Sequence, residues 1–249
     1  QYELLKKNKK KFFVKIDSKF KKDGQLNYGE AIIKGKFKKE ILISTYLCHP
    51  SMANDNLSGV LLTAFLAKYL RNKINLKWTY RIIIVPETIG AIGYLKENEK
   101  ILKNIDFGIN ICNCGGRGKF GYKQSLDKNH FINNLTEKTL KEKVKKFIKY
   151  PFDINGSDER QFSSPGFRIN VISITKDKYY EYPQYHSSLD NLDFVKPENL
   201  AKSLNVYKKL INNLENLNIY IRNQEHGEIM LSKHKFDRSH GGQYLPNKF

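Results

Sequence analysis

The segment CHPSMANDNLSG, residues 48–59, separates two apolar segments. Residues 40–47, EILISTYL, have the apolar character of a buried strand, and residues 60–70, VLLTAFLAKYL, have the spacing of a buried helix. His49 and Asp55 therefore lie in a connection between a strand end and a helix start. Two interpretations are open: a tight loop in which Asp55 caps the helix, and one half of a metal site.

Apolar strands alternate with helices along most of the chain. We expect further strands at residues 77–86, 107–114 and 169–176, and helices at 88–102, 136–150 and 197–217. Residues 12–38 are expected to form short β segments around a turn. This pattern predicts an α/β fold with a mostly parallel mixed sheet, helices on both of its faces and a small N-terminal β segment.

The composition excludes wholesale disorder and leaves the meaning of the charge open. Hydrophobic residues make up 40% of the 249 positions, but the formal net charge is +19. Such a charge favours nucleic acid, anionic membranes or acidic polymers as partners. The 44 Lys and Arg residues are scattered, however, which also fits a codon bias, and we expect no specific nucleic-acid partner.

The chain has neither a signal-peptide pattern nor an apolar segment long enough to span a membrane. Its three Cys residues give no disulfide framework, so we expect a cytoplasmic protein. The sequence does not decide whether the chain forms a homo-oligomer.

Acidic and imidazole side chains follow several of the expected strands. His49 and Asp55 follow the strand at 40–47, Glu87 follows the next strand, and His186 and Asp190 follow the strand at 169–176 after a loop. Because ligand sites in open α/β sheets lie outside the carboxyl ends of the strands, these residues are candidates for one site. Each has a structural alternative as a turn, cap or surface residue.

Four segments resemble the zinc aminopeptidase superfamily, whose fold also underlies glutamate carboxypeptidase and the transferrin-receptor ectodomain. They are ANDNLSGV at 53–60, PETIGAIGYL at 86–95, SDERQFSSPGFRINVISI at 157–174 and YHSSLDNLDFV at 185–195. Three segments together are most similar to a bacterial aminopeptidase-like family that is often encoded beside polysaccharide-biosynthesis genes: residues 48–59, GSDERQF at 156–162 and EYPQYHSSLDNLDFV at 181–195. The resemblance extends from about residue 17 to residue 217.

This resemblance implies a zinc aminopeptidase/phosphorylase-hydrolase-like fold and three parts of the chain. Residues 1–38 would be the remnant of a small β subdomain and the sheet edge, and residues 39–218 the aminopeptidase-like core. Residues 219–249 would be a connector to a missing winged-helix module, so that the chain would be a fragment of a longer protein.

The resemblance also assigns roles to individual residues. His49, Asp55 and His186 match metal ligands, and Glu87 matches the general base. Asp190 or the nearby Asp193 would orient His186.

Asp158, Glu159 and Arg160 are assigned to substrate binding, with a structural ion-pair cluster as the alternative. Two expected carboxylate ligands are replaced, one by Thr88 and the other by the pair Gly115 and Gly116. The remaining donors favour one zinc ion over two.

The predicted function is zinc-dependent amide hydrolysis, with a metal-activated water and Glu87 as the general base. The substrate would be a small peptide or an amide-bearing sugar, which fits polysaccharide or sugar metabolism. The alternative is a binding or scaffold protein that keeps the fold without catalysis, and a polyanion binder is a third hypothesis that rests on charge alone.

Overall fold

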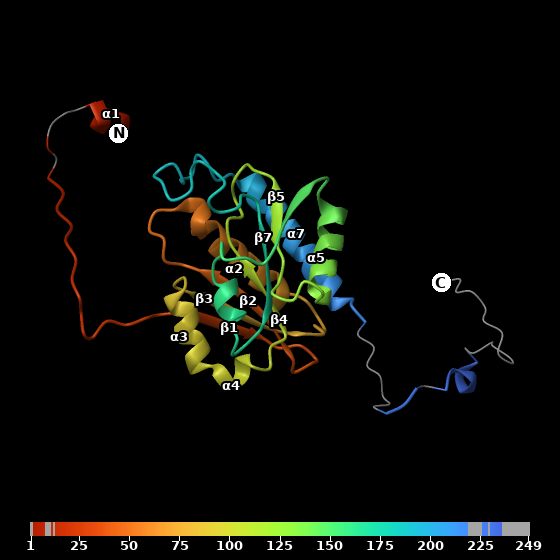
Figure 1. Cartoon of the computed structure of the whole chain (residues 1–249). Helices are drawn as coiled ribbons and strands as arrows, with labels where there is room; N and C mark the ends of the chain where they lie inside the picture. The colour runs from red at the N-terminus through yellow and green to blue at the C-terminus, as the bar shows by residue number, and fades with distance from the viewer. Residues whose placement is uncertain (1, 8–10, 12, 219–225, 229, 236–249) are drawn as a thin grey trace. The chain divides into compact units, whose positions relative to one another are not determined.

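The computed structural model describes residues 2–7, 11, 13–218, 226–228 and 230–235, and the chain separates into two compact units. The first unit, Gln1–Glu215, contains the sheet and its helices (Figure 1). The second unit, Asn216–Phe249, includes a 3₁₀ helix at Leu231–His234. Most of the predicted connector at 219–249 falls outside the described residues, so that assignment stays a prediction.

The described residues form one mixed, seven-stranded sheet in the order β1-β3-β2-β4-β7-β5-β6. Parallel pairing joins β2 to β3 and β4, β4 to β7, and β5 to β6, whereas β1 on β3 and β5 on β7 are antiparallel. The strands are β1 (Gly29–Ile33), β2 (Glu40–Tyr46), β3 (Thr79–Val85), β4 (Phe107–Ile111), β5 (Phe120–Lys123), β6 (Phe147–Tyr150) and β7 (Asn170–Thr175).

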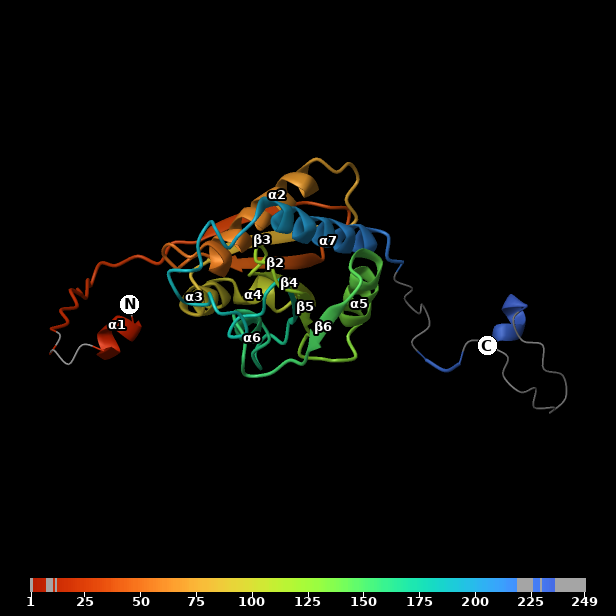
Figure 2. The same cartoon turned by 90° about the horizontal axis from the view of Figure 1, so that it is seen from above.

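Helices cover both faces of this sheet, as the sequence predicts. Figure 2 shows α2 and α7 on one side of the strands and α3, α4 and α6 on the other. The helices are α1 (Tyr2–Lys7), α2 (Ser58–Arg71), α3 (Ile89–Glu97), α4 (Glu99–Leu102), α5 (Phe131–Lys143), α6 (Glu159–Phe162) and α7 (Pro197–Glu215). The predicted fold class is confirmed.

Alternate residues of the central strands point to opposite faces of the sheet and fill two cores. In β2, Ile41 and Ile43 pack in the core that includes side chains from α2, α5 and α7, whereas Leu42 packs with side chains from α3, α4 and α6. Successive side chains of a strand point to opposite faces, so a strand buried on both faces is apolar at nearly every position. This is why the strand was recognisable in the sequence.

A buried arginine ties the edge of the sheet together. Arg81 on β3 forms ion pairs with Glu30 on β1 and with Glu40 on β2, the latter at 2.5 Å. The Arg81 side chain is only 4% exposed, and a guanidinium can satisfy two carboxylates with its five N–H donors. The antiparallel strand β1 is thereby linked by charge to the two parallel strands that carry site residues.

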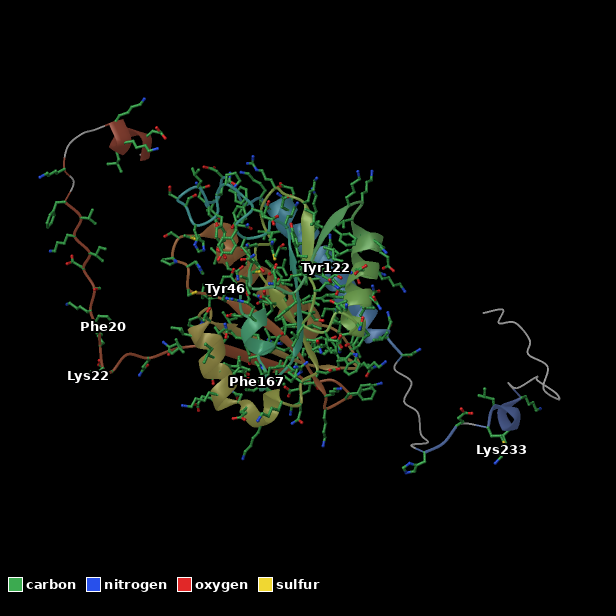
Figure 3. All side chains as sticks on the ribbon, viewed as in Figure 1. Phe20, Lys22, Tyr46, Tyr122, Phe167 and Lys233 are labelled. Atoms are coloured by element: carbon green, nitrogen blue, oxygen red, sulfur yellow. The ribbon has the colours of Figure 1, made fainter. Side chains whose placement is uncertain are left out.

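Two local predictions were wrong. Residues 13–20 are not in a strand, because in the described structure this segment pairs with no neighbouring strand. Phe13 and Phe20 are almost fully exposed, and Figure 3 labels Phe20. The helix expected at 136–150 instead begins at Phe131, where the His130 side chain accepts a hydrogen bond from the backbone N–H of Ile132. It ends at Lys143 and is followed by strand β6.

In the part of the chain that the structure describes, no helix combines the length and the apolarity that a membrane crossing requires.

The start of α2 packs closely against β4, and this contact positions the loop at 48–57. A Cβ atom on Gly59 would lie 2.3 Å from Asn56 Oδ1 and 2.6 Å from the Ile111 carbonyl oxygen. Both distances are too short for real contacts, and the second involves backbone. Only glycine lets the helix approach the strand this closely.

We therefore expect Gly59→Ala to lower the free energy of unfolding by about 1–3 kcal/mol through overpacking. Chemical denaturation measures the change. Gly166→Ala is the matched control, because no atom lies within 4 Å of its added Cβ, and its effect should stay within about 0.5 kcal/mol. Equal stability of the two variants would show that the α2–β4 contact relaxes freely.

Candidate metal site

The structure brings together four residues that the sequence places far apart. His49 follows β2, Glu87 follows β3, and His186 lies in the long loop after β7. One ligand atom from each of His49, Asp55 and His186 lies within 4.8 Å of the other two. Donor atoms that share a zinc ion at about 2.0–2.2 Å lie within about 4.4 Å of one another, so small side-chain adjustments would let these three hold an ion.

Asp55 is the buried centre of this group, with a side chain only 2% exposed. Its Oδ1 accepts a hydrogen bond from the Tyr46 hydroxyl at 2.5 Å, and its Oδ2 lies 3.0 Å from His186 Nε2. Burial is the main cause that raises the pKa of Tyr46 well above its usual range, so the hydroxyl stays protonated and donates a hydrogen bond to Asp55. Figure 3 labels Tyr46 in the α/β core.

Asp190 fixes the backbone beside Asp55. Its two carboxylate oxygens accept hydrogen bonds from the backbone N–H groups of Asn54, at 2.6 Å, and Asp55, at 3.0 Å. Its own carbonyl oxygen accepts from Ala53 N–H at 3.1 Å. The sequence predicts that Asp190 orients His186, but its carboxylate instead holds the loop that carries Asp55.

Two asparagines complete the support of this loop. Asn56 donates through Nδ2 to Thr45 Oγ1 at 2.9 Å and to the Tyr46 carbonyl at 3.1 Å, and its Oδ1 accepts from Asn113 N–H. Asn54 Oδ1 accepts from the backbone N–H of Gly115 at 2.8 Å. Side-chain amides thus supply the hydrogen bonds that an irregular buried backbone needs.

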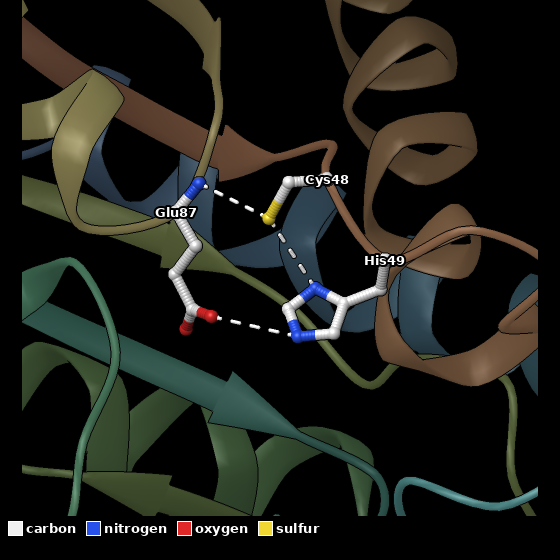
Figure 4. A group of neighbouring side chains, drawn as sticks. All are labelled: Cys48, His49 and Glu87. Carbon is white, nitrogen blue, oxygen red and sulfur yellow. Dashed lines mark hydrogen bonds and ion pairs between the residues drawn. The ribbon is translucent and has the colours of Figure 1, made fainter. Parts of the chain in front are cut away.

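Glu87 is held beside the three-residue group. Ser157 Oγ donates to Glu87 Oε1 at 2.6 Å, and Glu87 Oε2 lies 3.6 Å from His49 Nε2. Figure 4 shows the His49 ring with one nitrogen toward Glu87 and the other toward the Cys48 sulfur. The hydrogen bond from Ser157 therefore leaves Oε2 as the oxygen that faces the site.

Cys48, His49 and Glu87 form a second group whose spacing suits a metal ion. The Cys48 sulfur lies 3.4 Å from His49 Nδ1 and accepts a hydrogen bond from the Glu87 backbone N–H at 3.2 Å. Burial, the largest cause, raises the pKa of the Cys48 thiol. The two groups share His49, so they offer alternative sets of donors around one imidazole.

The positions where further carboxylate ligands were expected have other roles. The Thr88 backbone N–H donates to Asp158 Oδ1 at 2.7 Å, and Thr88 has a left-handed φ of 62°. A Cβ on Gly116 would lie 1.8 Å from Asp177 Oδ2, so close packing accounts for that glycine.

Cys112 directly follows β4 and is fully buried, and burial is the main cause that raises the pKa of its thiol.

The three residues assigned to substrate binding separate into two kinds. Asp158 and Glu159 have no exposed surface, and Glu159 lies 3.3 Å from Lys123 Nζ. Burial also raises the pKa of Asp158 to about 7. Glu159 therefore fits the structural alternative of an ion pair. Asp158 is buried without an ion pair among the described residues, and only its Oδ1 has a hydrogen-bond partner, the Thr88 N–H. Arg160 is exposed and lines a cavity beside the site.

Sequence reasoning missed the contributions of Tyr46, Ser157 and Tyr185. Tyr46 is the last residue of an apolar strand, Ser157 opens the quoted segment at 157–174, and Tyr185 precedes His186 and stacks on its ring at 4.0 Å. The sequence shows only that these three residues carry hydroxyl groups and that Tyr46 and Tyr185 lie near candidate ligands in the chain. It does not show which side chain each of them contacts.

Comparison with known proteins identifies the family of the chain. Residues 11–217 match the family model described as "Domain of unknown function (DUF4910)". The chain is 42% identical over 229 residues to a proposed polysaccharide biosynthesis protein with an aminopeptidase-like domain from Clostridium acetobutylicum, an alignment that covers 92% of this chain and 52% of that protein.

Solved structures show the same fold. A proposed peptidase from Clostridium acetobutylicum matches with a TM-score of 0.74 and 41% identity, over 83% of this chain and 48% of the other. A zinc aminopeptidase from Bacillus subtilis matches with a TM-score of 0.63 at 18% identity, over 74% of this chain and 49% of the other, which shows the fold alone. The chain spans about half the length of these relatives. It belongs to the DUF4910 family and has the fold of the zinc aminopeptidases.

Proposed function

We propose that this chain is a zinc-dependent amide hydrolase in which His49, Asp55 and His186 hold a single zinc ion. The observation that carries the proposal is the convergence of these three donors within 4.8 Å of one another, beside a carboxylate with one oxygen turned toward them. Two imidazoles and a carboxylate are a donor set that catalytic zinc sites use.

The donors fit zinc without further ligands. Three protein ligands leave a position of a tetrahedral ion open for solvent or substrate, which is the arrangement of catalytic rather than structural sites. A pair of ions would need more carboxylates, and Thr88 and Gly116 occupy the positions where these were expected. We therefore propose one ion.

When bound, zinc supplies Lewis acidity, which polarises a carbonyl and lowers the pKa of water. Glu87 Oε2 takes the proton from the attacking water and passes it to the departing nitrogen. Ser157 donates a hydrogen bond to Glu87 Oε1 at 2.6 Å, which fixes the carboxylate so that Oε2 faces the attacking water. Tyr46 and Asp190 keep Asp55 in place.

The substrate class follows from the reaction and from the relatives. An amide is cleaved, and a small peptide and an amide-bearing sugar are both candidates. The name of the Clostridium acetobutylicum relative refers to polysaccharide biosynthesis, and this supports a sugar substrate. Tyrosine side chains beside the site also favour a sugar or another ring.

A scaffold without catalysis is the second candidate. The replacement of expected carboxylates by Thr88 and Gly116 favours it. It predicts a chain that keeps its fold and binds no zinc, so metal content separates the two functions.

We expect about one zinc ion per chain after purification without chelator, measured by inductively coupled plasma mass spectrometry. His49→Ala removes a donor and should weaken zinc binding by at least about 100-fold, because mutation of residues that only hydrogen-bond to metal ligands already lowers metal affinity by about 10–100-fold. Cys48→Ser is the control and should keep the metal. Wild-type protein that takes up no zinc on titration would exclude the hydrolase.

Glu87→Gln should keep the zinc but lose about 10²–10⁴-fold in turnover, because the amide cannot accept the proton. N-acetyl-L-phenylalanine and L-phenylalaninamide are suitable probes, since hydrolysis of either releases phenylalanine for chromatography. Glu97→Gln, at the exposed end of α3, is the matched control. Turnover that survives in Glu87→Gln would mean that another group is the base.

Asp190→Asn should weaken zinc binding by about 10–100-fold and lower the melting temperature. The neutral amide has one acceptor oxygen, so one of the buried N–H groups of Asn54 and Asp55 loses its partner. Asp193→Asn, at an exposed position in the same loop, should change neither quantity. The reverse pattern would make Asp193 the supporting residue.

A further inference from the structure

A small cavity lies beside the candidate metal site and limits what can bind there. It has a volume of about 200 Å³, and Glu87 and His186 are among its lining residues together with Arg160. Pockets for drug-sized ligands are about 300–1,000 Å³. This cavity is therefore the size of one amino-acid side chain or one sugar ring.

In the proposed hydrolase, the carboxylates at the cavity already have roles: Asp55 is a zinc ligand and Glu87 is the general base. Asp158 is buried and is not among the lining residues. Glu87 is the one acidic residue among the described lining residues, and its two oxygens face Ser157 and His49. Both oxygens of Asp55 also have partners. A substrate with a free α-amine needs an anionic group to receive its ammonium, and no carboxylate of the described lining remains for that purpose.

Arg160 instead offers a positive charge. Its Nη1 donates to the Ile154 carbonyl at 2.9 Å, which holds the side chain at the cavity. Within the described structure, no carboxylate lies within 4 Å of the guanidinium nitrogens. A guanidinium has five N–H donors and binds carboxylate or phosphate in a bidentate manner, so donors remain for a ligand.

An aromatic wall stands on the same cavity. Tyr180 and Tyr185 have ring centroids 4.9 Å apart, and Tyr185 stacks on His186. Tyr180 is 69% exposed, so its face is open to a bound group. Tyrosine faces of this kind bind rings and apolar surfaces while their hydroxyl groups stay in water.

We propose that the substrate is an amide that carries an anionic group and has no free amine near the scissile bond. The anionic group, a carboxylate or a phosphate, binds Arg160, and a ring or apolar portion lies against Tyr180 and Tyr185. The inference rests on the proposed hydrolase function and names its substrate class. It departs from the chemistry of an aminopeptidase, which selects a free amine.

Three ligands without a scissile bond test the charge preference directly by isothermal titration calorimetry with the zinc-loaded wild-type chain. They are 3-phenylpropionate, 2-phenylethyl phosphate and 3-phenylpropylamine, which share a phenyl group and differ in charge. At least one anion should bind about 10–100-fold more tightly than the amine. The tighter of the two anions identifies the carboxylate or the phosphate as the recognised group.

Arg160→Gln should remove this preference: the affinity for the anion should fall about 10–100-fold, and the affinity for the amine should not change. Arg160→Lys keeps the charge and loses the bidentate geometry, so its affinity for the anion should lie between those of the wild type and Arg160→Gln. Arg71→Gln, at the C-terminal end of α2, removes the same charge elsewhere and is the control. Melting curves establish that each variant is folded.

Several outcomes would overturn the proposal: an amine that binds as tightly as both anions, anion affinity that Arg160→Gln leaves unchanged, or no binding of any probe. If the Arg160-dependent preference holds but neither phenylalanine amide is hydrolysed, the charge preference stands as a binding property and the hydrolase function fails.

Discussion

The loop between β2 and α2 is the constraint on which the rest of the site depends. It carries Asp55 into the interior, and an irregular buried backbone is stable only if its polar groups are paired. Asp190 supplies two acceptors to the backbone, and Asn56 and Asn54 bond to neighbouring segments. The loop therefore joins the ends of β2 and β4 to the long segment after β7, which also carries His186.

Much of the fold was predictable because the central strands are buried on both faces. Their continuous apolar character identified β2, β3, β4 and β7, and parallel strands end at the same edge of a sheet. The convergence of His49, Glu87 and His186 follows from that topology. The resemblance to the zinc aminopeptidases added a predicted role for each of these residues.

The polar partners were not predictable, because they depend on contacts between distant segments. Asp190 lies four residues after His186, so the sequence suggested that the two interact, but the fold places its carboxylate on the backbone of Asp55. Glu159 resembled a binding residue and is instead buried beside Lys123. Short strands such as β6 were also not predicted, because four residues show too little periodicity to distinguish a strand from a helix.

The choice between the two donor groups around His49 decides the chemistry. If Asp55 and His186 hold the ion, Glu87 is free to act as a base, whereas coordination by Cys48 and Glu87 would remove that base. Zinc K-edge X-ray absorption on the zinc-loaded chain distinguishes them. We predict nitrogen and oxygen neighbours at about 2.0–2.2 Å and no second metal. A sulfur neighbour at about 2.3 Å, or a metal at about 3.5–4 Å, would contradict the account.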